Sequence, residues 1–157
     1  VILNIKNNND AQKAYEKILS NVKKNAPNAK IDGVMVSPMI KGGIECILGA
    51  KIDPVFGPIV MFGLGGIYAE VMKDIAFAEA PLSNEQAEKM ILSLKGKDLF
   101  YGARGQSSTD IKSLIKVIVS LSNFIAANSD QVDQVEMNPL LVTENQIIAL
   151  DALIITK

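Results

Sequence analysis

Hydrophobic residues recur every three or four positions in three stretches of the chain, and this spacing predicts three helices. The first covers residues 10–25, and polar residues 7–10 can cap its free amides. The second covers residues 84–94, where Ser83 and Gln86 have the spacing of a capping box and Gly96 follows the end. The third begins at Asp110 and has a hydrophobic face suited to a core.

Shorter hydrophobic runs bounded by polar residues, glycine or proline predict strands. The predicted strands cover residues 1–5, 31–40, 44–52, 59–62, 74–80 and 136–142, with 147–150 folding back on the last of them. Residues 67–71 fit either a strand or a helical turn, and residues 99–105 are predicted to form a loop. Short connections rich in glycine and proline favour antiparallel pairing. Together these elements predict an α+β fold with a mixed, mostly antiparallel sheet and helices packed on one face.

Composition and charge narrow the classes of function. The chain has 157 residues, of which 48% are hydrophobic and 21% charged, enough for one domain with a core. Its 16 basic and 17 acidic residues are interspersed and the formal net charge is -1, so neither nucleic acid nor an anionic membrane is an expected partner. The chain has no histidine, which excludes a Ser-His-Asp triad.

Cys46 is the only cysteine, so an internal disulfide is excluded and a cytoplasmic location is predicted. Without a histidine to activate the thiol, a buried structural role is favoured over catalysis. The sequence has no apolar run long enough to span a membrane and no leader with a cleavage site. The chain opens on Val1 rather than an initiator methionine, which indicates that it is part of a longer protein.

The stretch from Glu136 to Asp151 is the strongest candidate for a metal site. Side chains two apart in a strand share a face, so Glu136 and Asn138 point the same way, and a hairpin would bring Asp151 back towards them. Two carboxylates and an amide carbonyl suit a hard cation such as Mg²⁺. The alternative is a solvated strand face with Asp151 in a loop.

Other candidates could contact a nucleotide. Gly65 and Gly66 could present backbone amides to phosphate, although a plain turn has the same composition. Glu45 is a carboxylate in an otherwise hydrophobic strand, so it is either paired or functional. Arg104, the only arginine, could bind phosphate bidentately as a catalytic residue, and the alternative is a surface arginine. A hydrophobic stretch suits adenine, although the pattern is also typical of a buried strand. Its candidate contacts are Met35, Val36, Ser37 and Met39.

Several motifs together resemble a known family. Glu-x-Asn-Pro-Leu from Glu136, followed by a hairpin and Leu-Asp-Ala around Asp151, looks like the metal-binding end of the ATP-grasp domain in succinyl-CoA synthetase β subunits. The sequence is even more similar to ADP-forming acyl-CoA (acetyl-CoA) synthetases. The motifs Val-x-Pro-Met, Glu-x-x-x-Gly, Asp-Pro-x-Phe-Gly-Pro and Gly-Gly precede it in the family's order.

The resemblance implies that residues 1–157 are one partial ATP-grasp domain, the C-terminal part, without the preceding subdomain. It implies that the chain binds ATP or ADP and Mg²⁺, with Glu136, Asn138 and Asp151 holding the metal. The implied enzyme is an acid-CoA ligase that interconverts acyl-CoA, ADP and phosphate with the acid, CoA and ATP. The implied partner is a CoA-binding subunit or domain that carries the phosphohistidine chemistry.

Two parts of the family's machinery are absent from the sequence: the nucleotide-gripping lysine of the preceding subdomain and the histidine that carries phosphate. The isolated chain is therefore expected to be inactive. The alternative function is a regulatory, non-catalytic ATP-grasp domain of a multidomain protein acetyltransferase. A third is a pure assembly module.

Overall fold

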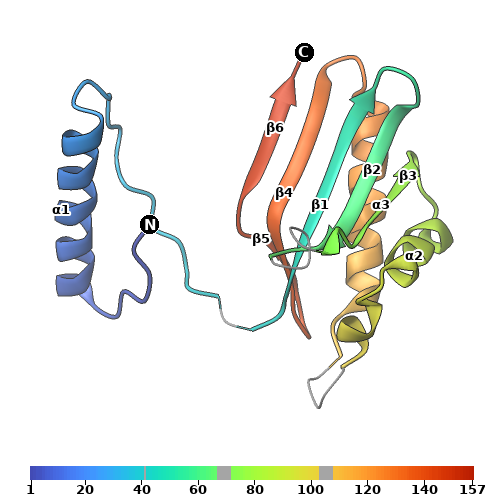
Figure 1. Cartoon of the computed structure of the whole chain (residues 1–157), viewed down its shortest axis with the longest axis horizontal. Helices are drawn as coiled ribbons and strands as arrows, with labels where there is room; N and C mark the ends of the chain where they lie inside the picture. Colours follow the sequence, from blue (N-terminus) through green and yellow to red (C-terminus); the bar gives the residue numbers. More distant parts are fainter. Residues whose placement is uncertain (41, 67–71, 103–107) are drawn as a thin grey trace. The chain divides into compact units, whose positions relative to one another are not determined.

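The computed structural model describes residues 1–40, 42–66, 72–102 and 108–157. The chain divides into two compact units, Val1–Lys41 and Gly42–Lys157 (Figure 1). Taken separately, the first unit contains helix α1 and the second contains the sheet with its helices. No helix in the described ranges is both long and apolar enough to cross a membrane.

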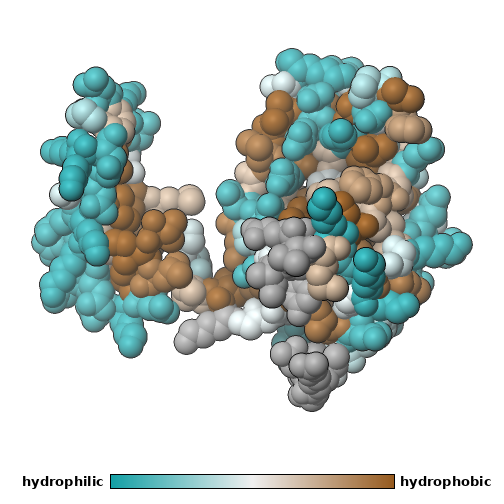
Figure 2. Space-filling model, in the orientation of Figure 1, coloured by the Kyte–Doolittle hydropathy of each residue, from teal (hydrophilic) through white to brown (hydrophobic). Residues whose placement is uncertain are grey.

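Helix α1 (Asn8–Asn25) confirms the first helix prediction. Its N-cap is Asn7, whose side-chain oxygen accepts a hydrogen bond from the Asp10 amide at 2.9 Å. Polar side chains follow one side of α1 and hydrophobic ones the other (Figure 2). No residue of α1 is buried, so its hydrophobic side is not covered within the first unit.

The prediction of strands at residues 1–5 and 31–40 is wrong. Neither segment pairs with a neighbour among the described residues of the first unit, and an extended segment becomes a strand only when its backbone groups pair with another strand. In the second of these segments Met35 and Val36 are 88% and 85% exposed.

The second unit is built on a sheet whose strands run in the order β3-β2-β1-β4-β5, with β6 also paired to β4. Every strand pair in the described residues is antiparallel, which confirms the predicted sheet. A tight turn joins β1 to β2, because Asp53 Oδ1 accepts hydrogen bonds from the Val55 and Phe56 amides at 2.9 and 3.1 Å. The strand bounds are β1 Ile44–Asp53, β2 Gly57–Leu64, β3 Ile75–Glu79, β4 Val132–Val142, β5 Ile147–Ala149 and β6 Ala152–Thr156.

Helices α2 (Asn84–Ser93) and α3 (Ile111–Ala127) cover one face of this sheet (Figure 1). The capping box of α2 forms as predicted: Ser83 Oγ accepts from the Gln86 amide at 3.2 Å, and Gln86 Oε1 accepts from the Ser83 amide at 2.8 Å. The first residues of the loop predicted at 99–105 instead belong to the 3₁₀ helix η2 (Lys97–Tyr101).

The core lies between the helices and the sheet. Alternation along β1 places Cys46, Leu48 and Ala50 on the covered face. Phe62 of β2 packs against Phe100 of η2, with ring centroids 6.1 Å apart, and both side chains are fully buried.

Candidate functional site

Strand β4 has a bulge at Asn138 and Pro139. The pairing of β4 with β1 shifts there, so two β4 residues lie opposite the single β1 residue Ile47. On the other edge of β4, the Asn138 amide donates to the Asp151 carbonyl at 3.2 Å, and the Leu150 amide donates to the Pro139 carbonyl at 2.9 Å. The return of Asp151 to Asn138 is thereby confirmed.

The side chains at the bulge are oriented by hydrogen bonds. Asn138 Nδ2 donates to Glu136 Oε1 at 3.2 Å, which confirms that these two residues share a face. Gln134 Nε2 donates to Glu136 Oε2 at 3.4 Å. Asp151 Oδ1 accepts from the Ala152 amide at 2.9 Å. Because Asn138 uses its NH₂ group on Glu136, its carbonyl oxygen is left for another partner.

This donor set fits Mg²⁺ chemically. Glu136 and Asp151 supply carboxylates and Asn138 supplies a carbonyl oxygen, which are the hard ligands that Mg²⁺ accepts beside water and phosphate. Asn138 and Asp151 are exposed and Glu136 is half-buried, so water and phosphate could reach a bound ion. In the described part of the chain, no three His, Cys, Asp or Glu side chains cluster to hold a metal, so the amide of Asn138 is essential to this set.

Glu136 lies on the sheet face opposite the helices. It pairs with Gly49 of β1, which pairs in turn with Met61 of β2, and Met61 pairs with Phe77 of β3. These residues border a shallow cavity of about 350 Å³ beside Glu136. Apart from Glu136, the residues that line this cavity are not among the site residues predicted from the sequence, although alternation along the strands gives Gly49 and Gln134 the same face. The cavity residues are Ile47, Gly49, Ala50, Lys51, Ile59, Met61, Phe77, Gln134, Val135 and Glu136.

Glu45, Gly65 and Gly66 come together where β1 begins and β2 ends. The Gly65 amide donates to the Glu45 carbonyl at 2.7 Å, and a Cβ on Gly65 would lie 3.0 Å from that oxygen. Gly66 has a φ of +57°, and a Cβ there would lie 3.6 Å from Glu45 Oε2. The amide of Gly65 already has a partner within the protein, and close packing against Glu45 explains why residue 65 is a glycine. Contact of Gly65 with a nucleotide stays a prediction.

Cys46 is structural, as predicted. Its side chain is fully buried in the core, and burial, with the neighbouring Glu45 charge as a smaller cause, raises the pKa of its thiol far above the ordinary value. The thiolate that a nucleophile or metal ligand needs is therefore strongly disfavoured.

The remaining predicted residues are not joined to this site by the structure. Met35, Val36, Ser37 and Met39 belong to the first unit, where each is exposed. Arg104 lies outside the described residues, as does the segment 67–71. Among the described residues that follow this gap, Thr109 donates hydrogen bonds from its amide and its hydroxyl to the Phe100 carbonyl, at 2.9 and 3.1 Å.

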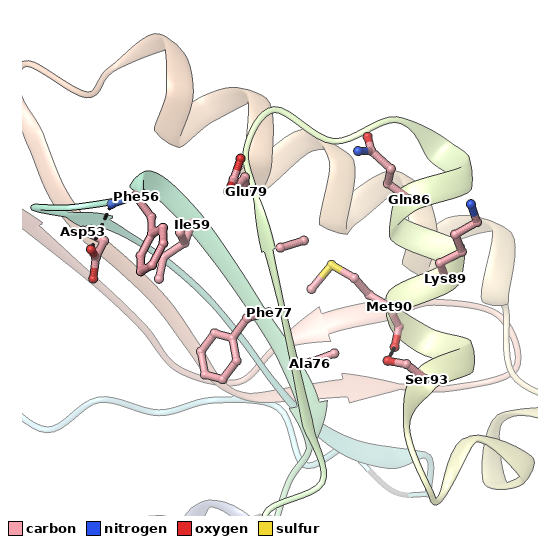
Figure 3. Close-up of a pocket in the computed structure, with 11 residues that line it drawn as sticks. Asp53, Phe56, Ile59, Ala76, Phe77, Glu79, Gln86, Lys89, Met90 and Ser93 are labelled. Atoms are coloured by element: carbon pink, nitrogen blue, oxygen red, sulfur yellow. Dashed lines mark hydrogen bonds between the residues drawn. The ribbon is translucent and has the colours of Figure 1, made fainter.

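A second groove, of about 750 Å³, surrounds the edge strand β3 and contains none of the predicted site residues. Figure 3 shows Met90 and Lys89 on the α2 side of β3, and Phe77, Ile59 and Phe56 on its other side. Because the strand itself passes between these side chains, the groove is an edge of the fold rather than an enclosed site.

The comparison with known proteins identifies the family. The profile of a family described as an ATP-grasp domain matches residues 1–156. The chain belongs to the ATP-grasp family. This confirms the resemblance found in the sequence, and it agrees with the predicted ATP-grasp fold.

Similar ATP-grasp proteins are CoA ligases by name. The chain is 37% identical over 159 residues to the β subunit of acetate–CoA ligase [ADP-forming] II of Pyrococcus furiosus, covering 100% of this chain and 67% of that one. It is 40% identical over 144 residues to 4-hydroxybutyrate–CoA ligase [ADP-forming] of Nitrosopumilus maritimus, covering 92% of this chain and 20% of that one.

A solved ATP-grasp structure is also similar. It is the dinucleotide forming acetyl-coenzyme A synthetase 1 of Ca. Korarchaeum cryptofilum, in complex with coenzyme A, Ca-AMPCP and HgCl⁺. The TM-score is 0.92 at 36% sequence identity, covering 99% of this chain and 68% of that one. This ATP-grasp chain thus spans about two thirds of the similar β subunit and a fifth of the longer ligase.

Proposed function

We propose that this chain is the nucleotide- and metal-binding part of an ADP-forming acyl-CoA (acetyl-CoA) synthetase. The observation that carries the proposal is that Asn138, at the β4 bulge, bonds through its side chain to Glu136 and through its backbone amide to Asp151. The enzyme would interconvert acyl-CoA, ADP and phosphate with the free acid, CoA and ATP. The ligase names of the relatives support this reaction class.

In this proposal Glu136, Asn138 and Asp151 hold Mg²⁺ against the nucleotide phosphates. The bound ion would offset negative charge on the transferring phosphoryl group. Gln134 and Asn138 fix both oxygens of the Glu136 carboxylate, so this ligand is oriented before any ion binds. The hydrogen bond from the Ala152 amide does the same for Asp151.

Nucleotide binding would use more of the chain. We assign Gly65, Gly66 and Glu45 to the turn that borders the phosphates, because the structure brings these three together. Arg104 is proposed as the catalytic residue that clamps a phosphate. Adenine is assigned to the backbone and side chains of Met35, Val36, Ser37 and Met39.

The proposal requires further partners. We infer that residues 1–157 are part of one ATP-grasp domain whose preceding subdomain completes the nucleotide cleft and covers the hydrophobic side of α1. A CoA-binding subunit or domain would supply the phosphohistidine chemistry. We place the enzyme in the cytoplasm. The regulatory alternative, an ATP-grasp domain in a protein acetyltransferase, gains no support from relatives that are named ligases.

The full-length protein, supplied with acetyl-CoA, ADP, phosphate and Mg²⁺, is expected to form ATP. Chelating the divalent metal with EDTA should abolish the reaction, and returning Mg²⁺ should restore it, because the phosphoryl transfer needs the ion. Anion-exchange chromatography of quenched samples measures the ATP formed in both steps, and this detection does not itself need Mg²⁺. The isolated 157-residue chain is the control and should be inactive. Absence of CoA-thioester-dependent ATP formation with acetyl-CoA and a panel of other acyl-CoAs would contradict the proposal.

A further inference from the structure

Asp74 is a carboxylate that the proposed mechanism does not use, and it is buried, with 4% of its surface exposed. Its Oδ1 accepts a hydrogen bond from the Lys95 amide and its Oδ2 one from the Gly96 amide, each at 2.8 Å. Its backbone carbonyl accepts a hydrogen bond from the Leu64 amide at 3.2 Å. One residue thus links the end of strand β2 to the turn that follows α2.

The surroundings of Asp74 suit a carboxylate. The N-terminal end of a helix carries partial positive charge, which favours an acidic neighbour. The Asp74 carboxylate accepts from the Lys95 and Gly96 amides, and Gly96 is the N-cap of η2. These two charge-assisted hydrogen bonds fix the place of Asp74 against the turn between α2 and η2.

The linked end of β2 leads directly into Gly65 and Gly66, which lie beside Glu45 of β1, and these three residues are here named the Glu45 turn. The Leu64 amide bonds to Asp74 on one side of β2, and the next amide, that of Gly65, bonds to Glu45 on the other side at 2.7 Å. The end of β2 also packs closely against the turn that follows α2, because a Cβ on Gly96 would meet the Leu64 side chain. The position of Gly65 and Gly66 relative to Glu45 therefore depends on where Asp74 is held.

We propose that Asp74 is a positioning residue for nucleotide phosphate binding, which it serves by bracing the end of β2 against the Lys95–Gly96 turn. The inference rests on the proposed function of the Glu45 turn. A carboxylate is required, because two N–H donors point at it and each needs an acceptor. Asparagine would present its NH₂ to one of those donors and would accept only the other.

The test uses Asp74→Asn in the full-length protein, assayed for ATP formation. The KM for ADP is expected to rise about ten-fold while the KM for acetyl-CoA is unchanged. Hydrogen exchange of the peptide covering residues 62–66 should speed up, since its amides lose their brace. If Asp74→Asn does not fold, Asp74→Ser takes its place. Serine also removes the carboxylate, but it sets no NH₂ group against the Lys95 or Gly96 amide.

Ser122→Ala is the matched control. Ser122 is also fully buried and its Oγ accepts from the Leu82 amide at 3.0 Å, but it holds the chain ahead of α2, not the end of β2. This variant should lower the melting temperature and leave both the KM for ADP and exchange at residues 62–66 unchanged. If Asp74→Asn behaves like Ser122→Ala in either readout, the positioning role is wrong.

Gly66→Ala separates this inference from the proposed function. It strains the turn directly, because φ at Gly66 is +57°. If Gly66→Ala raises the KM for ADP and Asp74→Asn does not, only the role of Asp74 fails. If neither variant changes that KM, the assignment of the Glu45 turn to phosphate binding fails together with it.

Discussion

Asp151→Asn is expected to lower metal-dependent turnover of the full-length protein by about 100-fold or more, with little change in stability. The substitution keeps the size of the side chain and removes one of the two carboxylates that would hold Mg²⁺. It also keeps an Oδ1 acceptor for the Ala152 amide. Because Asp151 is exposed, the free energy of unfolding should change by no more than about 0.5 kcal/mol.

A dependence on Mg²⁺ concentration would identify the lost function. If Asp151 is a metal ligand, the variant should need more Mg²⁺ for half-maximal turnover, and excess Mg²⁺ should partly restore activity. Asp133→Asn is the matched control, since Asp133 is an exposed carboxylate on the same strand β4 as Glu136. It should retain normal turnover. Normal turnover in Asp151→Asn, or loss explained by unfolding, would leave the metal site without support.

Phe100→Ala is expected to destabilise the protein by about 3–5 kcal/mol. Phe100 is fully buried and packs against Phe62, so its removal leaves a cavity between η2 and the sheet. Such a loss is a large share of the stability of a typical domain. Thermal unfolding should show a midpoint lower by roughly 10 °C.

Phe124→Ala tests whether the loss comes from burial rather than from removing any aromatic ring. Phe124 lies on α3 and is 40% exposed, so truncating it should cost about 1 kcal/mol or less. Similar midpoints for the Phe100 and Phe124 variants would mean that Phe100 does not anchor the core. Phe100→Leu, which retains much of the volume, should lie between Phe100→Ala and the unchanged protein.

Features determined by neighbouring residues were predictable from the sequence. The capping box of Ser83 and Gln86 formed as predicted, and the cap predicted among residues 7–10 is Asn7. Asp110, predicted to open the third helix, is its N-cap. Each of these caps depends on residues three apart in sequence. The shared face of Glu136 and Asn138 follows from strand alternation, and the structure confirms it.

Features that depend on partners distant in the sequence could not be predicted from it. The segments 1–5 and 31–40 are hydrophobic enough for strands, but the described residues of the first unit offer them no pairing neighbour. Strand β6 (Ala152–Thr156) was missed, although its run Leu-Ile-Ile could have signalled it. The bonds of Asp74 span 21 and 22 residues, and no local pattern indicates them.

The most direct test of the central claim is to locate the metal. A crystal structure of the full-length protein with Mn²⁺ in place of Mg²⁺ and a non-hydrolysable ATP analogue would show the ion by anomalous scattering. We expect a peak at coordination distance, about 2.0–2.3 Å, from oxygens of Glu136, Asn138 and Asp151 and in contact with the phosphates. A nucleotide-bound Mn²⁺ held by other residues, with these three side chains turned away, would contradict the claim.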